Sequence, residues 1–534
     1  MSDIVFSSVL DSAHQGDIQG ALGTIRHTDL GRRRSWSARL RTLAAIVGPG
    51  LIVMVGDNDA GAFGTYTQAG QNYGTALMWT LLLLVPVLYV NQEMVLRLGC
   101  VSRVGHARLI LERFGKFWGA FSVIDLFLLN GLTIVTEFIG INLALGYLGV
   151  PRIAGIAVAA GIIIAAASTG SFRRFERFSL ALCFFSLLLV PVFAMVHPPI
   201  GQIGHDLVRP AFPSGARLSD VMLLVIGIVG TTVAPWQLFF QQSYVIDKRI
   251  TPRFMGYEKA DLWIGIVIVL LGAIAMMAFA SVAFEGTAGF GHFSNAGAVA
   301  AGLEAHAGRA AGVMFALALL DASIIGASAV SLSTAYAIGD VLSLRHSLHR
   351  SAGDARGFYA VYAGVIGIAA ALVLFGSDGL LGLLTNAVQT LAGVLLPSAT
   401  VFLLLLCNDK AVLGPWVNGR WLNLFTGLVI WVLVLLSLIL TAATAFPGMP
   451  GRSMVVVLGI GSLVGIVGAG AYVFARPAPV RPVGGREWMM PPLASLAPPV
   501  VTRGTRLWLA VLRVYLVVAV GMVAFKIISL ATGG

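Results

Sequence analysis

The sequence is dominated by apolar stretches of about 20 residues, the length that an α-helix needs to cross the hydrocarbon core of a bilayer. Roughly thirteen such stretches can be placed between residues 43 and 530. Of all residues, 57% are hydrophobic and only 11% are charged, whereas a soluble protein carries about a quarter charged residues. These features predict an all-α polytopic membrane protein and argue against a soluble domain.

The distribution of basic residues predicts the orientation in the membrane. With the N-terminus placed in the cytoplasm, the inner segments hold 28 of the 35 Lys and Arg residues and the outer loops hold five. Cytoplasmic loops of membrane proteins carry such an excess. We therefore expect a multi-pass protein of the plasma (cytoplasmic) membrane with a cytoplasmic N-terminus. The same excess explains the net charge of +11, so no nucleic-acid partner is expected.

One apolar stretch is interrupted by polar residues near its middle. In GPGLIVMVGDNDAGAFGTYTQAG, residues 48–70, Asp57, Asn58 and Asp59 are followed by Ala-Gly-Ala. An unwound segment inside a span is tolerated only where protein covers it or where it lines a cavity, because lipid cannot pair its backbone groups. Transporters use such interrupted helices to bind ions near the bilayer midplane. Intramembrane carboxylates are functional by default, although capping of a helix end is an alternative role.

A second stretch, five spans later, is interrupted in the same way. The sequence GIVGTTVAPWQLFFQQS, residues 227–243, is broken by Pro235, with Thr231, Thr232 and Gln237 beside the break. Two interrupted helices five apart indicate an inverted repeat of five plus five helices.

The other segments flank these two repeats. The predicted organisation is a cytoplasmic N-terminal tail (1–42), a first repeat of helices 1–5 (43–197), a second repeat of helices 6–10 (219–407), helices 11 and 12 (421–475), a Pro-rich cytoplasmic linker (476–506) and an additional C-terminal helix (507–530). For the last helix we expect packing or a partner contact and no further role.

These motifs resemble those of the Nramp family of divalent-metal transporters. The family's helix 1 carries DPGN and then QAG, and this chain has Asp59-Ala60-Gly61-Ala62 and then Gln68-Ala69-Gly70. The family's helix 6 carries MPHN, and this chain has Ala234-Pro235-Trp236-Gln237. Further matches are TEFIG (136–140), FRRFE (172–176), Gln389 eight residues before Pro397, and the loop NDKAVLGPWVNGRW. The resemblance covers most of residues 43–440 and implies a LeuT-type fold with helices 1 and 6 unwound around the substrate.

The resemblance also implies where a metal binds and how this chain departs from the family. A typical Nramp protein holds its metal with the Asp and Asn of helix 1 and the Met of helix 6. The corresponding residues here are Asp59, Ala62 and Ala234. A thioether ligand favours transition metals, so this chain is left with oxygen ligands. We expect these to be Asp59, the amide of Gln237, exposed carbonyls and water, with Asp57 and Asn58 adding to the negative field.

A site with a few oxygen ligands suits Mg²⁺ in particular. Mg²⁺ gives up its waters reluctantly and is usually held by one or two carboxylates. Because two ligands are truncated to alanine, we expect a roomy site that suits partly hydrated Mg²⁺. In this respect the chain resembles the Nramp-related magnesium transporters.

Further polar residues of the spans are expected to line the vestibule or to take part in gating: Gln389, Glu93, Glu137, Trp236 and Thr231. For Glu93, an ion pair with Arg97, four residues on, is an equal alternative. Glu137 aligns with a family acid near the proton route, but Ile134 and Trp236 replace an acid and a histidine of proton-coupled members. The resemblance therefore implies transport without obligatory proton coupling.

Together, these features predict a secondary-type transporter that imports hard divalent cations by alternating access, with Mg²⁺ as the first candidate and Mn²⁺ as the second. Two alternatives stay open: a proton-coupled Mn²⁺ or Fe²⁺ transporter of the Nramp type and, from another class, a metal-binding membrane sensor. A sodium-coupled amino-acid carrier is disfavoured, since Asp57 and Asp59 would repel a substrate carboxylate. No Ser–His, Cys–His or phosphate-loop constellation is present, so we expect neither an enzyme nor a cofactor. The oligomeric state is not predicted.

Overall fold

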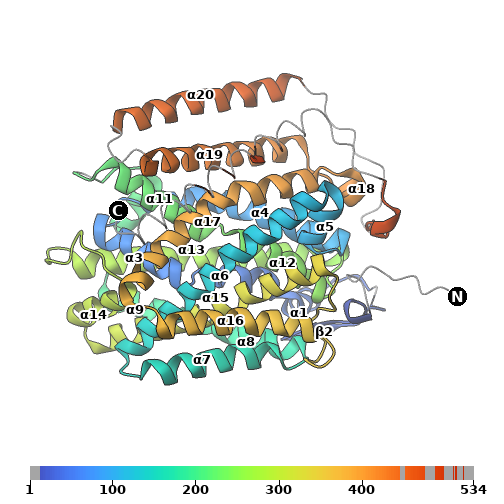
Figure 1. Cartoon of the computed structure of the whole chain (residues 1–534), viewed down its shortest axis with the longest axis horizontal. Coiled ribbons are helices and arrows are strands. Elements are labelled where there is room, and N and C mark those ends of the chain that lie inside the picture. Colours follow the sequence, from blue (N-terminus) through green and yellow to red (C-terminus); the bar gives the residue numbers. More distant parts are fainter. Residues whose placement is uncertain are drawn as a thin grey trace.

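The computed structural model of the chain is almost entirely helical (Figure 1). It describes residues 12–29, 31–213, 215–445, 451–475 and 488–497, together with Leu509, Leu512, Arg513, Val517 and Gly521. Most of the predicted linker 476–506 and of the predicted last helix 507–530 lies outside the described residues.

The helices follow one another along the chain with short connections. The first ten are α1 (Trp36–Ile46), α2 (Pro49–Val55), α3 (Ala60–Tyr73), α4 (Trp79–Ser102), α5 (His106–Phe114), α6 (Lys116–Tyr147), α7 (Arg152–Ala167), α8 (Phe172–Phe185), α9 (Leu189–Val196) and α10 (Ile200–Val208). The next ten are α11 (Leu218–Thr232), α12 (Pro235–Asp247), α13 (Met255–Phe284), α14 (Ala296–Ala307), α15 (Arg309–Leu342), α16 (Arg356–Phe375), α17 (Asp378–Cys407), α18 (Lys410–Leu413), α19 (Arg420–Ala445) and α20 (Gly451–Ala475). Before them, β1 (Ile18–Gly20) and β2 (Gly23–Ile25) form a small antiparallel hairpin.

Fewer helices than predicted have the length of a full membrane span. By length and composition, eight described helices can cross a membrane, or up to ten if each bent pair counts as one span. The prediction of roughly thirteen spans counted shorter helices as well. One example is α7, which is apolar but has only 16 residues.

Both predicted interruptions are present. Four residues, Gly56 to Asp59, separate α2 from α3. Val233 and Ala234 separate α11 from α12, and Pro235 is the first residue of α12. Proline is tolerated there because the first N–H groups of a helix have no partner within that helix. The predicted LeuT-type arrangement, with discontinuous helices 1 and 6, is therefore confirmed.

The interrupted helices lie inside the bundle. In Figure 1, α19 and α20 lie along one edge and α7 and α8 along the opposite edge. Between these edges α6 packs against α15, and α13 packs against both α2 and α3. The interruption between α2 and α3 is thus surrounded by protein, as an unwound segment at membrane depth requires.

The chain turns sharply at Gly48, within the predicted first span. Residues 43–46 belong to α1, which makes an angle of 54° with α2. Gly48 has φ = +157°, and a Cβ atom there would lie 2.3 Å from Oε1 of Glu176. Only glycine adopts such a conformation without strain. The predicted N-terminal tail therefore contains the β1–β2 hairpin and most of a separate helix.

Candidate metal site between the interrupted helices

The unwound segment between α2 and α3 carries two buried carboxylates. Asp57 and Asp59 are 1% and 4% exposed. Asp59 is the N-cap of α3, and its carboxylate accepts a hydrogen bond of 2.9 Å from the backbone N–H of Ala62. Capping and lining the site are therefore compatible roles for Asp59, because its second oxygen is not needed for this bond.

A third carboxylate joins Asp59 from α6. Oε2 of Glu137 accepts a hydrogen bond of 3.1 Å from the N–H of Ala60, the first residue of α3. Gly326 of α15 makes room for this arrangement, since a Cβ there would lie 2.8 Å from the Glu137 carboxyl group and 3.0 Å from Cβ of Asp59. The positive end of the α3 dipole stabilises both carboxylates.

Asp57 is held by a chain of side-chain amides from two other helices. Nε2 of Gln237, in α12, donates to Oδ1 of Asp57. Oε1 of Gln237 in turn accepts a hydrogen bond of 2.7 Å from Nε2 of Gln92, in α4. Gln237 thus contacts Asp57, and its oxygen already has a partner. To offer that oxygen to a metal, as the sequence analysis expects, the amide would have to turn over.

Gln92 was given no role by the sequence analysis, although a local signal was available. The run Asn91-Gln92-Glu93 is polar inside an otherwise apolar stretch. Buried polar side chains need hydrogen-bond partners, so this run indicates a polar contact between helices. The sequence does not say which helix provides it.

The residues around the second interruption enclose the site. Ala234 is the N-cap of α12, and its carbonyl oxygen accepts a bond of 3.2 Å from the N–H of Gln237. The buried indole of Trp236 lies against Gly56, 3.6 Å from the position of an added Cβ. Thr231 is buried. Of the predicted residues of helix 6, Trp236 and Gln237 lie next to the unwound part of helix 1.

The side chains of two predicted residues on helix 1 form no hydrogen bond with the carboxylates. Nδ2 of Asn58 donates a hydrogen bond of 3.2 Å to the carbonyl oxygen of Val269, so its side chain is directed at α13. Ala62 lies fully buried in the first turn of α3 and offers only its backbone N–H.

Glu93 lies in an ion-pair network. It pairs with Arg97 at 3.2 Å and with Lys259 at 2.8 Å. Arg97 also donates a bond of 2.6 Å to Oδ1 of Asn418. The predicted ion pair with Arg97 is therefore confirmed. The structure places Gln389 in α17, but its side chain lies outside the described part of the chain.

Several polar atoms of the site lack a protein partner. These atoms are Oδ2 of Asp57, Oδ1 of Asn58, Oε1 of Glu137 and Oγ1 of Thr231. Buried polar atoms without a partner usually contact ordered water or an ion. Among the described residues, no Lys, Arg or His pairs with Asp57, Asp59 or Glu137. We refer to these three residues as the acid site.

The acid site is not a preformed cage for a bare metal ion. Within the described residues, no three His, Cys, Asp or Glu side chains are arranged so that they could hold a metal ion together. Its three acids are 0 to 4% exposed, so the site is occluded in this conformation. The roomy site expected from Ala62 and Ala234 thus stays a prediction for an open state.

A second group of buried charges, which the sequence analysis missed, lies where α2 begins. Nζ of Lys248 pairs with Glu176 at 2.7 Å and donates a bond of 2.9 Å to the carbonyl oxygen of Val47. Oδ2 of Asp261 accepts bonds from the N–H groups of Gly48 and Gly50, at 3.1 and 2.7 Å. Both oxygens of Glu258 lack a partner. We call Glu176, Lys248, Glu258 and Asp261 the Lys248 cluster.

Comparison with known protein families identifies the chain's relatives. The sequence profile described as natural resistance-associated macrophage protein-like, or Nramp, matches residues 50–443, which include both interruptions. The chain belongs to the Nramp family.

Curated relatives of this Nramp chain cover most of its length. The divalent metal cation transporter MntH of Ralstonia nicotianae is 30% identical over 417 residues, which is 74% of this chain and 88% of the relative. The protein of the same name from Xylella fastidiosa is 26% identical over 465 residues, 84% of this chain and 93% of the relative.

A solved structure supports the fold of this Nramp chain. The Eremococcus coleocola manganese transporter, crystallised with an aromatic bis-isothiourea substituted compound, has a TM-score of 0.62 and 20% identity. The match covers 84% of this chain and 97% of that transporter. At this identity the match supports the fold and leaves the transported ion open.

Proposed function

We propose that this Nramp chain imports hard divalent cations, Mg²⁺ first and Mn²⁺ second, by alternating access and without obligatory proton coupling. The observation that carries the proposal is the acid site, whose three buried carboxylates have no cationic side chain as a partner among the described residues. Uncompensated charge in a membrane interior is costly, and such residues mark ion pathways. A divalent cation would provide the missing positive charge.

The available ligand atoms favour a hard cation. The polar side-chain atoms that border the interruptions belong to carboxylates, amides and hydroxyl groups, and the thioether position is occupied by Ala234. Oxygen ligands suit Mg²⁺ and Mn²⁺, whereas a thioether would favour softer metals. Asp59 and Glu137 each use one carboxylate oxygen to accept a hydrogen bond from a backbone N–H group in the first turn of α3. The site therefore offers few free carboxylate oxygens. Mg²⁺ tolerates this because it retains several of its waters.

The interrupted helices are the elements that change conformation during alternating access. In transporters of this type, one bundle rocks against the other around a fixed site at the midplane. The membrane potential favours entry of a dication into the cytoplasm, so no other driving force is required. The proposed orientation, with the N-terminus in the cytoplasm of a plasma-membrane protein, rests on the excess of Lys and Arg in the inner segments.

One observation favours the runner-up, a proton-coupled Mn²⁺ or Fe²⁺ transporter. The carboxylates of Glu137 and Asp59 both accept hydrogen bonds from the first turn of α3, and two adjacent carboxyl groups can share and pass on a proton. Against this, Ile134 is a buried apolar residue and Trp236 is a buried indole. Neither side chain can relay a proton.

Transport in proteoliposomes tests the proposal. Uptake of Mg²⁺ and of Mn²⁺ would be measured at a fixed membrane potential, with and without a pH gradient. We expect saturable Mg²⁺ uptake that is independent of the gradient, weakened in Asp57→Asn and retained in Asp125→Asn, a matched removal of an acid on α6 away from the interruption. Uptake that requires the gradient would favour the proton-coupled alternative. Metal binding without any uptake would favour a sensor.

A further inference from the structure

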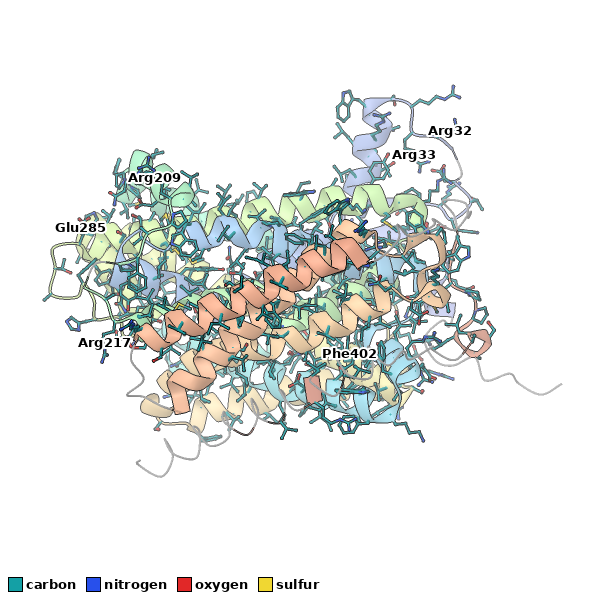
Figure 2. The ribbon with its side chains drawn as sticks, turned by 90° about the horizontal axis from the view of Figure 1, so that it is seen from above. Arg32, Arg33, Arg209, Arg217, Glu285 and Phe402 are labelled. Carbon is teal, nitrogen blue, oxygen red and sulfur yellow. The ribbon has the colours of Figure 1, made fainter. Side chains whose placement is uncertain are left out.

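A groove lies between α1 and the beginning of α13, far from the acid site. Its volume is about 410 Å³, and its lining residues are Trp36, Arg39, Leu40 and Leu43 of α1 with Arg253, Gly256, Tyr257 and Ala260. Figure 2 shows α1 projecting sideways from the helix bundle beside the labelled Arg32 and Arg33, at the opposite end from Arg209 and Arg217. The groove is therefore at the end of the bundle where the N-terminal segment lies.

One wall of the groove is an apolar stripe that the protein leaves uncovered. Trp36 is 76% exposed and Leu40 is 56% exposed, and Leu43 follows one turn later on the same face of α1. Ala45 and Ile46, on another face, are buried. A helix that lies across the end of a bundle with an exposed apolar stripe is typical of the membrane interface.

The other wall continues into the surface of α13 that faces away from the protein. Ile264, Val267 and Leu271 are exposed apolar residues of this helix. They follow Tyr257 and Ala260 at helical spacing, so all five share one face. Exposed apolar residues along a helix that spans the bilayer contact lipid chains. The groove therefore opens onto lipid.

Two arginines, Arg39 and Arg253, are among the residues that line the groove. Arg39 donates to the carbonyl oxygen of Arg33 at 3.3 Å, and Arg253 donates to the carbonyl oxygen of Gly31 at 2.9 Å. In the described part of the chain neither forms an ion pair with an acid within 4 Å. The nearby Asp29 pairs with Arg33 and is also within electrostatic range of Arg253. Guanidinium groups are well suited to bind phosphate.

We propose that this groove binds an anionic phospholipid of the leaflet on the N-terminal side. Its phosphate would lie between Arg39 and Arg253, and an acyl chain would follow Leu40, Leu43 and the exposed face of α13. Trp36 and Tyr257 take positions typical of aromatic residues at the level of the headgroups. Since α1 leads directly into α2, the bound lipid anchors the helix that begins the interrupted span.

Quenching of Trp36 by brominated lipids tests this proposal. The full chain would be reconstituted in neutral phosphatidylcholine vesicles containing a minor fraction of brominated phosphatidylglycerol or, separately, of brominated phosphatidylcholine. Because the chain has ten tryptophans, the contribution of Trp36 is the difference between the wild type and Trp36→Phe. We expect the anionic lipid to quench Trp36 about threefold more strongly than the neutral one, because each arginine near the surface adds to the attraction.

Two double variants decide which residues create the preference. Arg39→Gln with Arg253→Gln should remove the difference between the two lipids. Arg209→Gln with Arg217→Gln, at the other end of the bundle, should leave it unchanged. Both variants alter surface residues, and an unchanged thermal midpoint would confirm that they fold. Equal quenching of wild-type Trp36 by both lipids, or a preference that survives the loss of Arg39 and Arg253, would overturn the proposal.

Discussion

Two of the buried acidic groups in the described part of the chain differ in one respect. The acid site and the Lys248 cluster each contain three carboxylates that are at most 4% exposed. Both also bind backbone N–H groups at the beginning of a helix, α3 in one case and α2 in the other. The Lys248 cluster contains its own cation, fully buried and 2.7 Å from Glu176. The acid site has none among the described residues.

Under the proposed function, this difference distinguishes a structural charge group from a transport site. A permanent lysine fixes the turn between α1 and α2, because it binds a carboxylate and a backbone carbonyl at once. A site that must load and release its cation cannot contain a permanent one. Burial of acids alone therefore does not identify a substrate site, and the proposed function rests on a group of buried acids that has no cationic partner among the described residues.

The largest effect is expected from removing the capping carboxylate of the acid site. Asp59→Ala should reduce Mg²⁺ uptake to the background of empty vesicles, because a dication in a medium of low polarity needs a formal negative charge nearby. The measurement is uptake in proteoliposomes with an Mg²⁺ indicator. Wild-type uptake by a folded Asp59→Ala protein would contradict the assignment.

The second prediction applies the comparison to stability. Lys248→Met should lower the free energy of unfolding by about 3–5 kcal/mol, because it leaves buried carboxylates unpaired. Asp57→Asn should leave it unchanged or raise it, since it removes an uncompensated charge. Thermal unfolding in detergent measures both variants. A matched control is Lys259→Met, whose ion pair with Glu93 is partly exposed and should contribute less than about 1 kcal/mol. Equal losses in the two lysine variants would remove the distinction between the two groups.

A third prediction concerns the choice of metal. Ala234→Met with Ala62→Asn should shift the ratio of Mg²⁺ to Cd²⁺ affinity toward Cd²⁺ by about tenfold, or about 1.4 kcal/mol. The thioether binds the softer ion, and the smaller site hinders an ion that keeps its waters. Calorimetry on the purified proteins gives the ratio. Ala234→Leu with Ala62→Asn fills similar space without sulfur, so a similar shift there would mean that volume sets selectivity.

Substitutions in the chain of amides formed by Gln237 and Gln92 should have a smaller effect on Mg²⁺ uptake. Gln237→Ala should raise the KM for Mg²⁺ about threefold, because water can replace an amide. Gln92→Leu keeps the volume and removes the donor to Gln237, so its effect should be similar in size. If the two residues act as one unit, the double variant should raise the KM for Mg²⁺ no more than either single variant does. Additive effects in the double variant would show that Gln92 acts independently of Gln237.

The smallest effect is expected for proton movement during Mg²⁺ uptake. Vesicles loaded with a pH-sensitive dye should show no acidification that follows Mg²⁺ entry, in the wild type or in Glu137→Gln. Glutamine keeps an oxygen that can accept from the N–H of Ala60, so uptake should stay within about twofold of the wild type. Acidification that tracks Mg²⁺ in the wild type and disappears in Glu137→Gln would favour the proton-coupled alternative.

The sequence by itself determined the class of fold and the positions of the two interruptions. Apolar stretches predict spans, and Asp57, Asp59 and Pro235 inside such stretches predict the two interruptions. These features are local, because a polar or helix-breaking residue at membrane depth needs compensation wherever it lies. The resemblance to the Nramp family aligned Glu137 with a family acid near the proton route, and the structure places its carboxylate at the first turn of α3.

Only the tertiary structure decided which groups meet. It paired Gln237 with Asp57 and Gln92, directed Asn58 at α13, and placed Glu93 between Arg97 and Lys259. It also joined Lys248 to Glu176, which lies 72 positions earlier in the chain. Such contacts depend on the rotation and depth of each helix relative to its neighbours, and those are set by packing over the whole bundle rather than by any local pattern.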